Sequence, residues 1–130
     1  MYATLVPGNN NLITIANLCP NLETIKYLNA NVSEAEWNEF SLKVGSELIQ
    51  FYYCDVILHW LFTIYYVKFL FKQLKNIEIL EYQTKDSGED EKELFGYLNL
   101  YENLKSLSWL RQENLYEFNE NMISVLQRVN

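Results

Sequence analysis

The chain of 130 residues has few of the residues that linkers, disulfide frameworks and many active sites require: four Gly, two Pro, two Cys and one His. So few Gly and Pro residues exclude a long flexible linker or a low-complexity tract. Cys19 and Cys54 form no CxxC motif and no cluster with histidine, which argues against a structural zinc site. We interpret both as small buried hydrophobic residues. The opening MYATLVPGNNNL has no signal-peptide pattern, so a reduced, cytoplasmic setting is expected.

Groups that could carry catalysis are scarce as well. The single histidine, His59, lies beside Trp60 in the most apolar segment and is interpreted as structural. Cys54 and His59 could form a nucleophile pair, but the pattern shows no acid to orient them. The acidic residues between 89 and 93 follow a predicted helix start, which spreads carboxylates rather than gathering them around a metal. We therefore predict a protein without catalytic residues, metal or cofactor.

Charge and hydropathy exclude two classes of partner. The net charge is −7, and the ten basic residues are scattered rather than clustered, so nucleic-acid binding is not expected. The apolar run 56–71, VILHWLFTIYYVKFLF, contains His59 and Lys68 and is shorter than the roughly 20 residues that span a bilayer. A helix buried in protein is the expected state of this run, with an interfacial helix as the alternative.

What the sequence does contain is a recurring apolar pattern, apolar-x-x-apolar-x-apolar. It occurs in LETIKY, LIQFYY, IEILEY and LKSLSW, whose first residues are Leu22, Leu48, Ile77 and Leu104. The copies therefore begin 26, 29 and 27 residues apart, and Asn precedes the first apolar residue in three of them. Each copy has the length and alternation of a short strand whose first, fourth and sixth positions face a core.

Each interval between copies contains one stretch with helical character. The predicted helical stretches are residues 31–47, 56–74, 88–101 and 119–130, preceded by a short apolar segment at 12–18 that could begin another helix. In the first interval, Ser33 can cap a helix whose Trp37, Phe40 and Val44 share one face. In the third, Asp86 or Ser87 can serve as the cap. The repeating unit is thus strand, loop, helix and loop.

Units of this kind cannot bury their own apolar faces, and stacking is the physical solution. We predict an α/β fold, a short solenoid with parallel strands on one face and helices on the other. It forms a single domain over 1–130 with about four repeats. The expected strands lie near 22–28, 48–54, 77–83 and 104–110, and each is followed by the crossover that parallel pairing requires.

The stretch Cys19-Pro20-Asn21-Leu22, with its Ser33-capped helix, resembles the cysteine-containing leucine-rich repeats of F-box proteins. LKNIEILEY (74–82) and ENLKSLSWL (102–110) are similar to strands of the same group. Three copies lack the Cys-Pro, and nothing in the chain resembles an F-box. The resemblance implies a non-enzymatic protein-protein interaction module, and more narrowly the substrate-recognition part of an F-box-type ubiquitin ligase.

The side chains between the core positions should form the partner-binding, concave face. Inward-facing aromatic residues, such as Tyr27, Tyr53 and Trp109, are interpreted as core. The predicted partner-binding residues are Thr24, Lys26, Leu28, Gln50, Tyr52, Ile79, Glu81, Gln83, Ser106 and Ser108, with Cys54 and Leu110 at equivalent positions. Tyr52 is the one large aromatic among them, and Lys26 and Glu81 could add charge selectivity.

A second interpretation stays open from the residues alone. A short acidic chain rich in Tyr could be a compact inhibitor or immunity protein that blocks a basic toxin or nuclease. The four strand-like copies would then pair antiparallel or be coincidental. In either case the expected partner is another protein, and end repeats without polar caps could also join copies into a homo-oligomer.

Overall fold

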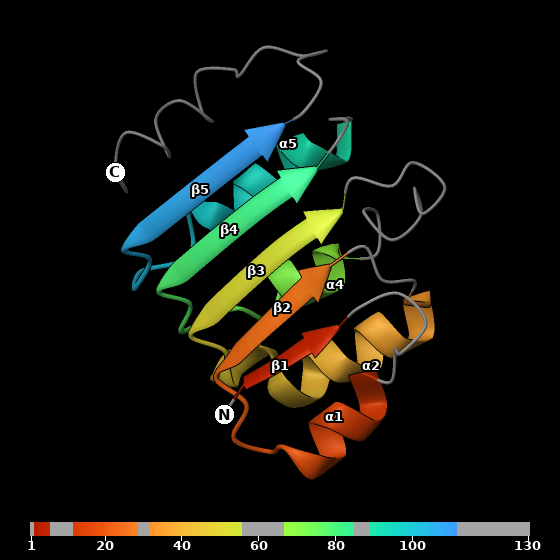
Figure 1. Cartoon of the computed structure of the whole chain (residues 1–130). Helices are drawn as coiled ribbons and strands as arrows, with labels where there is room; N and C mark the ends of the chain where they lie inside the picture. The colour runs from red at the N-terminus through yellow and green to blue at the C-terminus, as the bar shows by residue number, and fades with distance from the viewer. Residues whose placement is uncertain (1, 6–11, 29–31, 56–66, 85–88, 112–130) are drawn as a thin grey trace.

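The protein has an α/β architecture in which five parallel strands form one open sheet in the order β1-β2-β3-β4-β5 (Figure 1). The computed structural model describes residues 2–5, 12–28, 32–55, 67–84 and 89–111. Every neighbouring pair of strands is parallel, so the order in the sheet is the order along the chain. The antiparallel pairing expected from the inhibitor interpretation is not found among these strands.

Strands and helices alternate through the described residues. The strands are β1 (Tyr2–Leu5), β2 (Thr24–Leu28), β3 (Gln50–Asp55), β4 (Ile79–Thr84) and β5 (Ser106–Arg111). The helices are α1 (Leu12–Leu18), α2 (Glu34–Val44), α4 (Lys68–Phe71) and α5 (Glu89–Leu98), with a 3-10 turn η1 (Gly45–Glu47) after α2. Of the predicted segments, 119–130, most of 56–74 (with His59) and the caps Asp86 and Ser87 lie outside the described residues.

The register confirms the repeat spacing read from the sequence. Thr24 pairs with Gln50, Gln50 with Ile79 and Ile79 with Ser106, so equivalent residues lie 26, 29 and 27 positions apart. The strands begin two residues later than predicted, because the first apolar residue of each copy belongs to the preceding loop.

One strand was missed by the pattern. β1 pairs with β2 at an offset of 22 residues, with Tyr2 opposite Thr24. The first apolar position of this copy would precede Met1, so the three-position pattern cannot be read there. The sheet therefore has a fifth strand that the sequence pattern did not predict.

A repeated backbone contact joins the loops that lead into the strands. In three successive units, one carbonyl oxygen accepts two N–H groups of the next unit. Glu23 O accepts from Ile49 N and Gln50 N at 2.8 and 3.0 Å, and Ile49 O accepts from Glu78 N and Ile79 N at 2.8 and 3.1 Å. Glu78 O accepts from Lys105 N and Ser106 N at 2.8 and 3.1 Å. These bonds extend the ladder beyond the strands and satisfy backbone groups that the turns would otherwise leave unpaired.

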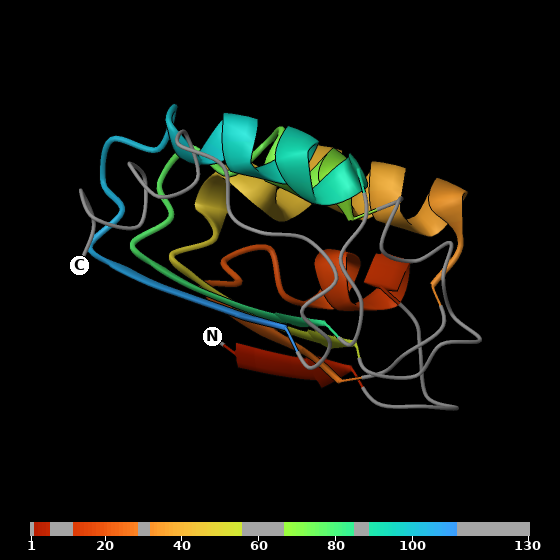
Figure 2. The same ribbon diagram turned by 90° about the horizontal axis from the view of Figure 1, so that it is seen from above.

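All the described helices lie on the same side of the sheet (Figure 2). The residues at positions one, four and six of each copy face them and are buried; only Leu104 is partly exposed. The helices contribute Trp37, Phe40, Val44, Leu70, Phe71, Leu94 and Leu98 to the same core. At about 25 cal/mol for each Å² of apolar surface, this burial is the main stabilising term of the fold.

An aromatic ladder runs across the sheet inside this core. Tyr27, Tyr53, Tyr82 and Trp109 occupy the same position on β2, β3, β4 and β5. Their ring centroids are 4.7, 4.9 and 4.2 Å apart in that order, and each pair is stacked within 19° of parallel. Phe71 of α4 meets Tyr82 and Trp109 edge-on. Strict register places similar rings side by side, and stacking adds to their burial.

The predicted cap of α2 is confirmed. Ser33 has extended backbone angles, and its Oγ accepts the Glu36 N–H at 3.3 Å. Trp37, Phe40 and Val44 are buried, as their spacing indicates. In the third interval α5 ends at Leu98, so Tyr101, predicted on the helix, is buried in the loop that follows it.

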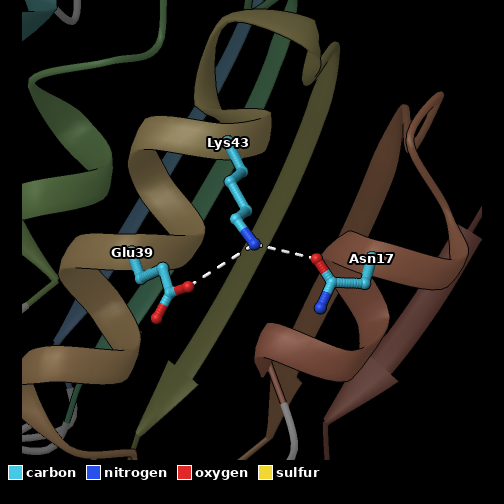
Figure 3. Close-up of polar contacts among 3 residues, drawn as sticks. All are labelled: Asn17, Glu39 and Lys43. Atoms are coloured by element: carbon cyan, nitrogen blue, oxygen red, sulfur yellow. Dashed lines mark hydrogen bonds and ion pairs between the residues drawn. The ribbon is translucent and has the colours of Figure 1, made fainter.

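Lys43 links α2 to α1 on the outside of the helical layer. Its Nζ donates to Asn17 Oδ1 of α1 at 2.8 Å and lies 3.4 Å from Glu39 Oε1 one turn earlier in α2 (Figure 3). All three side chains are exposed, so these contacts should contribute little to the free energy of unfolding.

Candidate partner-binding face

The face of the sheet turned away from the helices is here called the open face. Strand alternation arranges its side chains in three rows, because equivalent residues of β2 to β5 lie in register. The amino row contains Thr24, Gln50, Ile79 and Ser106. The middle row contains Lys26, Tyr52, Glu81 and Ser108. The carboxyl row contains Leu28, Cys54, Gln83 and Leu110. All ten predicted partner-binding residues are thus brought together on one face.

Polar and apolar residues are distributed unevenly over these rows. Most members are half-buried between their neighbours, whereas Glu81, Ser106, Leu28 and Leu110 are exposed. The two leucines at the ends of the carboxyl row expose 40% and 54% of their surface. Their apolar side chains stand in water at opposite ends of a row whose centre is Cys54 and Gln83.

The middle row carries the charge of the open face. Lys26 Nζ of β2 lies 5.2 Å from the centroid of the Tyr52 ring on β3, which is a cation-π distance. The Tyr52 hydroxyl donates to Gln50 Oε1 at 3.1 Å, and this bond fixes the ring toward the amino row. On β4, no described residue forms an ion pair with the exposed Glu81 carboxylate. In the middle row, the Tyr52 ring therefore lies between the cation of Lys26 and the strand that carries the Glu81 anion.

A hollow of about 360 Å³ lies between the middle and carboxyl rows. Its lining takes Lys26 and Leu28 from β2, Tyr52 and Cys54 from β3, Glu81 and Gln83 from β4, and Ser108 and Leu110 from β5. The hollow therefore runs across four strands rather than along one. Its walls offer one cation, one anion, an aromatic ring and two apolar ends.

The charged and thiol side chains of the three rows lie on separate strands: Lys26 on β2, Cys54 on β3 and Glu81 on β4. Within the described ranges, no three His, Cys, Asp or Glu side chains are close enough together to hold a metal ion. Cys54 and Cys19 are both half-buried thiols, not the fully buried residues that the sequence indicated. His59, the other member of the suggested nucleophile pair, lies outside the described residues.

A second hollow of about 360 Å³ lies on the helical side, between α4 and the loop after α5. Tyr101 at its border donates to Phe71 O at 2.5 Å, and burial raises the pKa of the Tyr101 phenol well above its ordinary value. The neighbouring Tyr97 donates to Glu93 Oε1 at 3.3 Å, and its pKa is raised by burial and by the Glu93 charge. These phenols keep their protons at neutral pH and act as structural hydrogen-bond donors.

Cys54 and Leu110, which alternation along their strands already placed on the open face, line the hollow. One position of this face was not predicted. Thr4, opposite Lys26, is an exposed residue of β1, the strand that the pattern missed. Alternation along YATL was the available signal, but four residues are too few to identify a strand.

A scan against protein-family models finds no match for this chain, and a search of curated proteins finds no relative. In the described part of the chain, no helix is long and apolar enough to cross a membrane. The function must therefore be argued from the open face itself.

Proposed function

We propose that this protein is a leucine-rich-repeat-like solenoid that acts as a non-enzymatic protein-protein interaction module. Its partner binds the open face of the sheet. The sequential parallel order of the strands and their near-constant spacing support the repeat architecture. The double hydrogen bond that recurs before β3, β4 and β5 supports equivalent units rather than coincidental similarity.

The observation that carries the functional proposal is the hollow across the middle and carboxyl rows. A sheet face that only had to remain soluble would carry scattered charges. This face instead places an aromatic ring between a cation and an anion, with two exposed leucines beyond them. An aromatic anchor near the centre, surrounded by polar and apolar contacts, is typical of binding surfaces.

The narrower proposal is that the module recognises substrates for an F-box-type ubiquitin ligase. It rests on the resemblance to F-box repeats of residues 19–22 with the helix after them, and of the stretches 74–82 and 102–110. Ligase subunits among the captured proteins would support it. A single basic toxin or nuclease would favour the inhibitor interpretation instead.

Affinity purification from the native host tests the proposed function. Tagged protein should capture a specific partner, and the double variant Tyr52→Ala with Glu81→Ala should lose it while staying folded, with a melting temperature only a few degrees lower. A matched double variant on the helical side, Leu42→Ala with Glu102→Ala, alters two exposed residues and should retain the partner. Capture that survives the open-face variant would refute binding at this face.

A further inference from the structure

The hollow on the open face is elongated across the strands, and this shape restricts the ligands that can fill it. It runs across β2 to β5 between two rows of side chains. Its ends are Leu28 on β2 and Leu110 on β5, three strand spacings apart, or about 14 Å at 4.8 Å per spacing. An extended chain rises about 3.4 Å per residue, so side chains four positions apart are also about 14 Å apart. In an extended peptide that lies across the strands, the side chains of the first and fifth residues can therefore contact Leu28 and Leu110.

The charges restrict the residues between these two positions. Lys26 belongs to β2, but its ammonium lies over the Tyr52 ring and so is displaced toward β3. Glu81 projects from β4, the next strand. The Lys26 cation therefore lies nearer to the strand of Glu81 than the Lys26 backbone does. Residues two and four of the peptide share one side of an extended chain, about 7 Å apart, and can face this pair.

We propose that the open face binds an extended segment with the pattern apolar, acidic, small, basic, apolar, in either chain direction. The acidic side chain pairs with Lys26, and the basic one pairs with Glu81. The small central residue faces Cys54 and Gln83, where the carboxyl row offers no apolar contact. This inference rests on the proposed function and identifies the class of segment that the partner presents.

The probe is the blocked pentapeptide LEAKL, titrated into ¹⁵N-labelled full-length protein and followed by NMR. The expected result is saturable shifts of β2 to β5 amides near the hollow, with the amides of α1, α2 and α5 unmoved. LEAEL and LKAKL each lose one favourable charge pair and should bind about two- to fivefold more weakly, the range for exposed ion pairs. SEAKS, without apolar ends, should bind more weakly still.

A charge reversal in the protein provides the sharper test. Glu81→Lys places two cations in the middle row, so this variant should prefer LEAEL to LEAKL. Glu102→Lys makes the same change at an exposed residue away from the open face and should keep the original ranking. A ranking that reverses in Glu81→Lys alone is not expected from a general change in net charge.

The inference is overturned by any of three results: no shifts at millimolar peptide, shifts confined to the helical layer, or equal affinities for all the peptides. These failures are distinct from failure of the proposed function. Loss of the captured partner on Tyr52→Ala with Glu81→Ala, together with no peptide binding, would leave the interaction module standing with a different ligand class. Capture that ignores those substitutions would remove both proposals.

Discussion

The two faces of the same sheet differ in almost every property except their backbone. On β3, Phe51 and Tyr53 are buried against the helices, while their neighbours Gln50 and Tyr52 lie half-buried on the open face. The backbone hydrogen bonds and the register are the same for both faces, because successive residues of each strand alternate between them. The difference shows that burial is set by the helices that cover one face, while side chains on the other face stay half-buried or exposed.

The two sides of the sheet also differ in whether their polar side-chain atoms form hydrogen bonds. On the open face, the Tyr52 hydroxyl bonds to a neighbouring side chain in the same strand. In the core between the sheet and the helices, the indole Nε1 atoms of Trp37 and Trp109 are buried and have no hydrogen-bond partner among the described residues. An unpartnered buried donor is unfavourable, so apolar packing of these rings must outweigh that cost.

Removing one ring from each face should produce the largest difference. Tyr82→Ala removes the stacking partner of Tyr53 and Trp109 and leaves a cavity, so it should lower the free energy of unfolding by about 3 to 5 kcal/mol. Tyr52→Ala removes a half-buried ring and one cation-π contact and should cost about 1 kcal/mol or less. Urea unfolding of both variants measures the difference. Equal losses would contradict the distinction between the faces.

Substituting the two described glycines by alanine tests how tightly the helical layer is packed around each of them. A methyl group at Gly45 would lie 2.5 Å from the Cβ of Gln73, an atom that cannot swing away. Gly45→Ala should therefore destabilise the fold by about 1 to 3 kcal/mol. Gly96, exposed within α5, has nothing within 4 Å, so Gly96→Ala should stabilise by about 0.5 to 1 kcal/mol through its helix propensity. Thermal unfolding should move the two midpoints in opposite directions.

The buried hydroxyl of Tyr101 should make the free energy of unfolding depend on pH. Tyr101→Phe loses the bond to Phe71 O and should cost about 1 to 2 kcal/mol at pH 7. Burial raises the pKa of this phenol above its ordinary value of 10.0, so above that pH the unfolded chain ionises while the folded chain holds the proton. Wild-type stability should therefore fall as the pH rises above 10.

The phenylalanine variant lacks this titration, which makes it the control for the pH effect. The stability gap between wild type and Tyr101→Phe should narrow between pH 10 and pH 11, in unfolding curves measured at each pH. A constant gap over this range would show that the Tyr101 pKa is not raised by folding.

The smallest effect is expected on the outside of the helical layer. Lys43→Gln removes the exposed pair with Glu39 and alters the contact with Asn17, so the free energy of unfolding should change by less than about 0.5 kcal/mol. The difference should vanish in 1 M salt, where the Debye length is about 3 Å. A larger or salt-independent loss would mean that this bridge holds α1 in place.

Much of the covered side could be predicted because its signal is periodic. The core positions Leu22, Ile25 and Tyr27 recur in later copies, and one apolar face of α2 follows from Trp37, Phe40 and Val44. The open face was predicted only as a set of residues. Its rows and hollow require the register between strands, which no single stretch contains, and β1 was missed because its pattern is incomplete in the chain.

The spacing of the strands, the alternation of their inward and outward side chains, and the cap of α2 can all be predicted from the amino-acid sequence. These follow from local periodicity and short-range hydrogen bonds, which a few adjacent residues suffice to specify. That Lys26 lies over Tyr52 on the strand next to Glu81, and that Leu28 and Leu110 end a common hollow, follows only from the packed fold. Lys26 and Tyr52 are 26 residues apart along the chain, Tyr52 and Glu81 are 29 apart, and Leu28 and Leu110 are 82 apart, so parallel pairing alone brings them onto one face.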